Sequence, residues 1–181
     1  MPKLCAAGIQ LREQIDDDYP DRDRKSDGWI ADARHLAKGT SDHIPDAKSG
    51  IVRGLDIDAD LSAHKEEAYA LVEKIRKLAK KGDKRIAYII FDGKIMSPIL
   101  GWKRRKYNGA NPHRSHFHIS FTTLGDKDGS YFELEGESNE RPKKSRRKLG
   151  QSVPSSSTSD LPSGGIRPCC HCKCSSSISL A

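Results

Sequence analysis

Three of the seven histidines of this chain fall within six positions, in the segment His113-Arg-Ser-His116-Phe-His118. The segment continues into Ile-Ser-Phe, and its alternation predicts a β-strand with His116 and His118 on one face and Phe117 on the other. Two imidazoles on one face of a strand can bind a single metal ion or exchange protons with a substrate. This segment is therefore the first candidate for chemistry.

A second group of polar residues lies upstream, in Ser41-Asp42-His43 and in the segment Arg53-Gly-Leu-Asp56-Ile-Asp58. A catalytic zinc ion is commonly held by two histidines and one carboxylate, with one coordination position left open. We therefore assign His43, Asp56 and His118 as zinc ligands. Asp58 is the alternative carboxylate, since it shares a strand face with Asp56.

The other two histidines of the cluster are candidates for proton transfer. His116 shares its strand face with His118 and would handle a proton or stabilise an oxyanion. His113, just after Pro112, would serve as a second proton acceptor. Bound zinc polarises a carbonyl and lowers the pKa of water, so the predicted chemistry is hydrolysis, including that of amides.

The surrounding sequence predicts the elements that position these residues. The pattern of apolar residues and of helix-stop and turn signals favours helices at Gln10–Asp18, from Ser26 (with Ser26 or Asp27 as the cap) to His35, and at Ser62–Lys81. It favours a loop at Gly39–Gly50 and strands at Ile51–Ile57, at Arg85–Phe91 with a turn into Lys94–Ser97, and at the histidine segment up to Thr123.

Composition changes along the chain predict three parts: an N-terminal segment (1–25), a folded domain (26–137) that contains the candidate zinc ligands, and a disordered tail (138–181) rich in Ser, Pro and Cys. The tail contains the basic run 141–148 and four of the five cysteines. Such a composition buries too little apolar surface to offset the entropy of ordering the chain.

The whole chain carries a net charge of +7. A cationic chain is attracted to nucleic acid or to an anionic cell envelope, and we read the basic run as a solvated tail rather than as a nucleic-acid site. We see neither a signal peptide nor a membrane-spanning segment, so we expect a protein without a Sec-type export route of its own. Calcium is disfavoured because no Asp-x-Asp-x-Asp-Gly loop is present.

The motifs Ser41-Asp-His43, Gly54-Leu-Asp56 and the H-x-x-H-x-H of positions 113, 116 and 118 resemble the LAS-type zinc peptidases. That group contains D-alanyl-D-alanine carboxypeptidases, L-alanyl-D-glutamate endolysins and murein endopeptidases, and it shares its fold with Hedgehog signalling domains. The histidine pattern is similar to that of the murein endopeptidases, and the chain as a whole is similar to peptidase-like proteins of actinobacterial phages. The resemblance covers about Leu11 to Leu134.

The resemblance implies a small α+β domain in which an antiparallel sheet is flanked by helices. It implies Zn²⁺ as the cofactor, His43, Asp56 and His118 as its ligands, and His116 with His113 as catalytic residues. The implied substrate is a stem peptide or crosslink of bacterial peptidoglycan, cleaved by an endolysin or a wall-processing enzyme. For such a protein we expect a location in the host cytoplasm until its release to the cell wall, or in a virion. We expect Ser41, Arg53 or Arg34, Trp102 and Tyr107 to contact the substrate.

Two departures from the family pattern leave other functions open. His43 and Asp56 are thirteen positions apart instead of the usual seven, which requires a loop inserted at Pro45–Gly50. No carboxylate stands three positions before His116 or His118, where the family places its base. A zinc-folded wall- or partner-binding module without catalysis is the first alternative, and a basic nucleic-acid-binding protein is the second.

Overall fold

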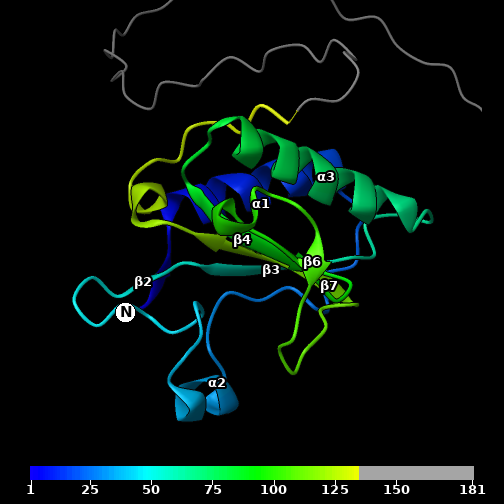
Figure 1. Cartoon of the computed structure of the whole chain (residues 1–181). Helices are drawn as coiled ribbons and strands as arrows, with labels where there is room; N and C mark the ends of the chain where they lie inside the picture. Colours follow the sequence, from blue (N-terminus) through cyan, green and yellow to red (C-terminus); the bar gives the residue numbers. More distant parts are fainter. Residues whose placement is uncertain (135–181) are drawn as a thin grey trace, which may run out of the picture. The chain divides into compact units, whose positions relative to one another are not determined.

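The computed structural model describes residues 1–134 as an α+β unit built on a five-stranded antiparallel sheet. The sheet order is β3-β7-β4-β5-β6, and the strands are β3 (Gly54–Asp58), β4 (Ile86–Phe91), β5 (Lys94–Met96), β6 (Arg105–Lys106) and β7 (His116–Phe121). The long helices α1 (Ala6–Asp18) and α3 (Glu66–Lys81) lie on the same side of the sheet (Figure 1). The predicted α+β class, with an antiparallel sheet flanked by helices, is confirmed.

Smaller elements complete the unit. A parallel pair joins β1 (Lys3–Leu4) to β2 (Ile51–Val52). The short helix α2 (Ala33–Lys38) lies away from α1 and α3 (Figure 1), and single 3-10 turns form at η1 (Pro98–Leu100) and η2 (Thr123–Asp126).

The hydrophobic core lies between the sheet and the two long helices. The buried residues of α3 recur at helical spacing, as an amphipathic helix requires, and they are Ala68, Leu71, Val72, Ile75 and Ala79. Leu11 and Ile15 of α1 and Phe117 and Ile119 of β7 are buried in the same core. Because strand residues alternate, burying Phe117 and Ile119 turns His116, His118 and Ser120 to the opposite face of the sheet.

The helices differ from the sequence prediction mainly at their first residues. α1 starts at Ala6 instead of Gln10, with the Cys5 thiol accepting a hydrogen bond from the Gly8 N–H (3.4 Å). α3 starts at Glu66 instead of Ser62 and ends at Lys81, as predicted, with Gly82 as its C-cap. Residues 1–25, predicted as a segment preceding the domain, thus supply α1 to the main core.

The helix predicted to begin at Ser26 or Asp27 is wrong, and both residues instead contact β3. The Ser26 N–H donates to the Asp58 carboxylate (2.8 Å), and the Asp27 carboxylate accepts from the Asp58 N–H (2.8 Å). Gly28 then forms a β-bridge with Asp56, and α2 begins only at Ala33. A helix cap would use the side-chain oxygen of Ser26 or Asp27, but here the Asp27 carboxylate accepts a hydrogen bond from a neighbouring strand instead.

The strand predicted at 51–57 is divided at Arg53 into β2 and β3. The N–H groups of Arg53 and Gly54 both donate to the carbonyl oxygen of Asp42 (3.1 and 2.8 Å), which draws the predicted 39–50 loop against the chain at this point. The hairpin predicted at Asp92-Gly93 is confirmed, with positive φ at both residues (45° and 66°).

The predicted disordered tail, with its basic run and its cysteines, lies outside the described residues. Within residues 1–134, none of the helices has the length and apolar character needed to cross a bilayer.

Candidate metal centre

Three side chains from separate parts of the chain meet on the sheet face opposite the helices. Asp56 of β3 and His118 of β7 are direct cross-strand partners, with Asp56 Oδ1 2.8 Å from His118 Nδ1. His43 reaches them from the loop before β2, and its Nε2 lies 3.2 Å from His118 Nδ1 and 3.3 Å from Asp56 Oδ2. The predicted ligand trio is therefore brought together, although His43 and Asp56 are thirteen positions apart in the sequence.

The geometry fits a zinc ion. Ligand atoms bound to a tetrahedral zinc at about 2.0–2.1 Å are separated from one another by about 3.3 Å. The two distances from His43 Nε2 agree with that value, and the His118–Asp56 distance is somewhat shorter. Two imidazoles and one carboxylate form a donor set that zinc accepts while keeping a position for substrate.

The charges within the trio also suit a cation. Burial opposes ionisation of Asp56, but hydrogen bonds from His118 and His43 hold the pKa of this carboxyl well below its usual range. Burial alone would lower the pKa of His43, yet the hydrogen bond to Asp56 and a backbone hydrogen bond to Trp29 raise it. The protein thus places a half-buried carboxylate, charged at neutral pH, between two imidazoles. The backbone hydrogen bond to Trp29 also orients the His43 ring, as such bonds commonly do for metal ligands.

His116 and His113 extend the cluster on the same face. Together with Asp56 they form a second group whose donor atoms lie within 4.8 Å of one another. His116 Nε2 is 3.7 Å from Asp56 Oδ2, and the His113 ring centroid lies 5.0 Å from that of His116 and 5.6 Å from that of His118. All four histidines named by the sequence analysis therefore surround one carboxylate.

His113 has an unusual backbone and an open ring nitrogen. Its φ is 52°, a left-handed value that costs energy for a residue with a side chain. Its Nδ1 is buried and has no hydrogen-bond partner among the described residues. Burial and the nearby charges of His118 and His116 lower its pKa to about 4, and burial also lowers the pKa of His116. Both rings are neutral at pH 7, so each has one nitrogen that can accept and one that can donate.

A hydrogen-bonded group next to the trio was not predicted from the sequence. The Asp42 carboxylate accepts hydrogen bonds from the Tyr88 hydroxyl (2.5 Å) and from the Ser120 hydroxyl. Tyr88 also packs against His118, with ring centroids 5.6 Å apart. This group attaches the loop bearing His43 to β4 and β7. The only sequence signal for it was that Asp42 adjoins His43.

Gly54 allows that loop to approach the sheet. A Cβ atom at this position would lie 2.9 Å from the Asp42 carbonyl carbon and 3.0 Å from the His43 nitrogen, both of them backbone atoms. Real Cβ atoms essentially never come this close to backbone, so only glycine fits here. The glycine of the family-like Gly54-Leu-Asp56 motif thus has a direct steric role in placing His43.

The predicted substrate residues are dispersed. Tyr107 lies at the cluster, with its ring 5.6 Å from that of His113, and Ser41 accepts a hydrogen bond from the His43 N–H (3.3 Å). Arg53 instead forms a two-pronged ion pair with Asp126 (2.7 and 2.6 Å), and Trp102 is buried in the hydrophobic core. The side chain of Arg34 lies outside what the structure describes. Tyr107 and Ser41 are therefore the two substrate candidates that the fold keeps near the metal ligands.

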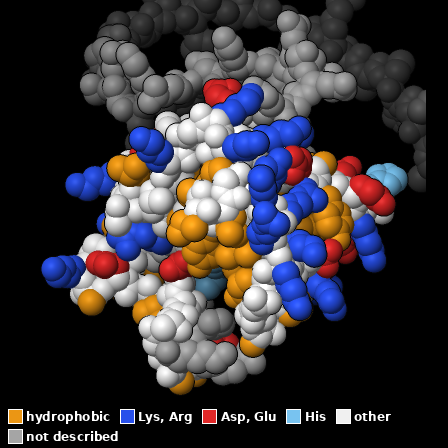
Figure 2. Space-filling view, viewed as in Figure 1, with side chains coloured by type: hydrophobic (Ala, Val, Ile, Leu, Met, Phe, Trp, Pro, Cys, Tyr) orange, Lys and Arg blue, Asp and Glu red, His pale blue; other side chains and the backbone are white. Residues whose placement is uncertain are grey.

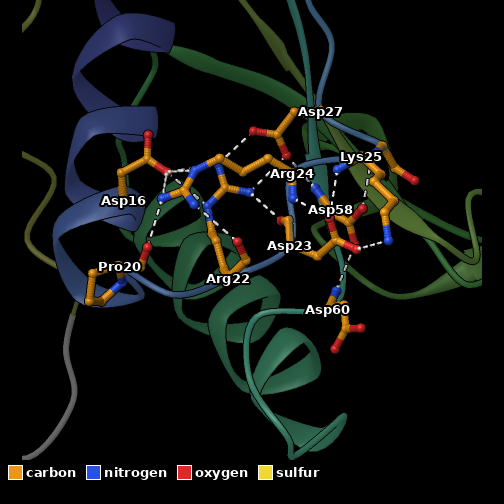
Figure 3. Close-up of polar contacts among 10 residues, drawn as sticks. Asp16, Pro20, Arg22, Asp23, Arg24, Lys25, Asp27, Asp58 and Asp60 are labelled. Atoms are coloured by element: carbon orange, nitrogen blue, oxygen red, sulfur yellow. Dashed lines mark hydrogen bonds and ion pairs between the residues drawn. The ribbon is translucent and has the colours of Figure 1, made fainter.

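Asp58, the alternative ligand, has a structural role. It accepts hydrogen bonds from the N–H groups of Ser26 and Asp60 (2.8 and 2.9 Å). Its own N–H donates to Asp27, which is paired with the buried Arg22 (Figure 3). Asp58 belongs to neither potential ligand group in the described part of the chain, so the geometry favours Asp56.

Comparison with known proteins finds no relative. No family model matches the chain, and neither a curated protein nor a solved structure does. The resemblance to the LAS-type peptidases therefore depends on the motif residues themselves, and the function has to be argued from the geometry of the site.

Proposed function

We propose that this protein is a zinc-dependent peptidase, a carboxypeptidase or an endopeptidase, that hydrolyses peptide bonds of bacterial peptidoglycan. The observation that supports this most strongly is the convergence of His43, Asp56 and His118, whose donor atoms are spaced as zinc ligands are. The peptidoglycan substrate follows from the likeness of the motifs to LAS-type peptidases, whose Hedgehog-like fold we propose for this domain. A role as a phage endolysin or wall-processing protein belongs to the same proposal.

The residues around the trio have separate roles in the proposed hydrolysis. Bound zinc would act as a Lewis acid that polarises the scissile carbonyl and activates water. His116, neutral and 3.7 Å from the Asp56 carboxylate, accepts the proton of the attacking water, and the carboxylate stabilises the resulting imidazolium. His113, with a pKa near 4, is a weak base, so it acts as a neutral hydrogen-bond donor to the carbonyl oxygen. Tyr107, packed on His113, limits the positions that this ring can take.

The test couples metal content to cleavage. Purified full-length protein should contain one zinc per chain and release new termini from peptidoglycan, and a chelator should abolish that release. His43→Ala and His118→Ala should lose both zinc and activity. His64→Ala is the matched control, because His64 is exposed and belongs to neither ligand group. Full activity in the presence of a chelator would contradict the proposal.

A binding module that holds zinc without turnover is the second candidate. It is favoured by the observation that Asp56 is the single carboxylate in the two ligand groups found within residues 1–134. It predicts one zinc per chain, binding to wall fragments and no new termini. The nucleic-acid alternative depends on the basic run 141–148, outside the described residues, and predicts binding that falls steeply with salt and survives His118→Ala.

A further inference from the structure

The register of the sheet places one arginine on the same face as the proposed metal site. The cross-strand pairs form a single row, which consists of Asp56, His118, Ile90, Ile95 and Arg105. Directly paired residues of neighbouring strands point to the same face. The row therefore starts at the two zinc ligands, crosses two isoleucines and ends at Arg105 on the edge strand β6.

Contacts on both sides of β6 confirm this orientation. Tyr107, two residues after Arg105 and on the same face, packs against His113 of the site. Arg104, which points the other way, pairs with Glu73 of α3 on the helix side of the sheet (2.9 Å). Lys106 shares that helix side with its cross-strand partner Lys94. Adjacent residues of β6 thus carry the same charge to opposite faces.

The Arg105 side chain is exposed, and within residues 1–134 no carboxylate forms an ion pair with it. From Gly93 to Gly125 the chain contains no Asp or Glu, although it contains six Lys or Arg. Lys and Arg side chains gather on the surface around β6 and α3 (Figure 2). Glu73, on the helix side, is already paired with Arg76 and Arg104.

The distance to the metal site fits an extended peptide. Arg105 lies three strands from His118, which corresponds to about 14 Å at a strand spacing of about 4.8 Å. An extended peptide advances about 3.3 Å per residue, so about four residues span this distance. Of the two isoleucines between the ends, Ile95 is partly exposed and can contact such a peptide, whereas Ile90 is buried.

We propose that Arg105 binds a carboxylate of an acidic peptide substrate, several residues away from the bond held at His43, Asp56 and His118. The inference rests on the proposed peptidase function and adds a substrate feature to it, an anionic group distant from the cleaved bond. Arginine suits this role because its planar guanidinium binds a carboxylate through two parallel hydrogen bonds.

The experiment compares Arg105→Gln with Lys106→Gln in the full-length, zinc-loaded protein. The probes are a synthetic stem pentapeptide, L-Ala-γ-D-Glu-meso-diaminopimelate-D-Ala-D-Ala, and the same peptide with its internal carboxylates amidated. Binding is measured by calorimetry and cleavage by chromatography. Arg105→Gln should weaken binding of the acidic peptide by about tenfold or more, as loss of a charge-assisted hydrogen bond does. It should leave the amidated peptide unaffected, and Lys106→Gln should change neither.

The outcomes separate this inference from the proposed function. Binding that depends on Arg105 without any cleavage would support the carboxylate site and refute the peptidase. Cleavage with equal affinities for wild type and Arg105→Gln would refute the carboxylate site alone. Equal losses in Arg105→Gln and Lys106→Gln would show a general effect of charge and overturn the inference. Competition by a single-stranded oligonucleotide at physiological salt, lost in Arg105→Gln, would overturn the assignment to an acidic peptide.

Discussion

Gly54→Ala should damage the metal centre without touching any ligand. The added methyl group would lie 2.9–3.1 Å from three backbone atoms of Asp42 and His43, and backbone cannot rotate away as a flexible side chain can. Overpacking of this kind typically costs about 1–3 kcal/mol of unfolding free energy. Relief of the clash requires the loop to move, which displaces His43 from the two other ligands. If 1.4 kcal/mol or more of this cost falls on the metal-bound state, zinc affinity falls by about tenfold or more.

The assay measures zinc affinity by competition with a chromophoric chelator, and the stability of the metal-free protein by urea unfolding. Gly28→Ala is the matched control. Gly28 also adjoins the site through its β-bridge with Asp56, but a Cβ atom there would meet nothing within 4 Å. Gly28→Ala should retain wild-type affinity. The steric explanation is refuted if Gly54→Ala keeps both its affinity and its stability, or if the two variants are equally impaired.

Two further predictions concern stability. Arg22→Met should cost about 1–3 kcal/mol in urea unfolding, because its fully buried side chain pairs with Asp27 and Asp16, of which Asp16 keeps a second ion pair with Arg24; the exposed Lys25→Met should leave the stability nearly unchanged, and equal losses would contradict the argument. Glu73 should stabilise the fold at neutral pH and lose this effect in acid. Its pKa is lowered to about 2, first by the hydrogen bond from Arg76, so its contribution is present above the unfolded pKa near 4.5 and is lost as the pH falls towards 2. The difference between wild type and Glu73→Gln, about 1 kcal/mol at pH 7 for such a partly exposed pair, should shrink by pH 2.5, and a constant difference would contradict it.

The sequence predicted the site residues best where strand alternation decides their direction. His116 and His118 share a face because Phe117 and Ile119 have to enter the core, and the pairing of β3 with β7 then places Asp56 directly opposite His118. These are consequences of a two-residue period, which is visible in one sequence. The hairpin at Asp92-Gly93 was predictable for a similar reason, since its turn chemistry is local.

Residues whose roles depend on distant partners were not predictable in this way. Ser26 and Asp27 look like a helix cap, yet they hydrogen-bond to β3 about thirty residues later. Arg53 looks available for a substrate carboxylate until Asp126 is seen to neutralise it. The Tyr88–Asp42–Ser120 group joins three segments with no characteristic spacing. Strand faces follow from local alternation, whereas the partner of a polar side chain follows from the tertiary fold.

The carboxylate base of the LAS-type peptidases is missing from the motifs of this chain, and the histidines here fall into two sets. His43 and His118 contact the charged Asp56 and form the ligand trio with it, while His113 lies outside the trio, with a left-handed backbone and an open ring nitrogen. Backbone strain persists where the surrounding structure enforces it, and here the Asp92 and Gly93 N–H groups bind the carbonyls of His113 and Pro112 (2.9 and 2.7 Å). A merely structural histidine would satisfy its ring nitrogens before accepting such a backbone. The left-handed backbone of His113 and its open Nδ1 therefore support our proposal of a catalytic site over a zinc site that serves the fold alone.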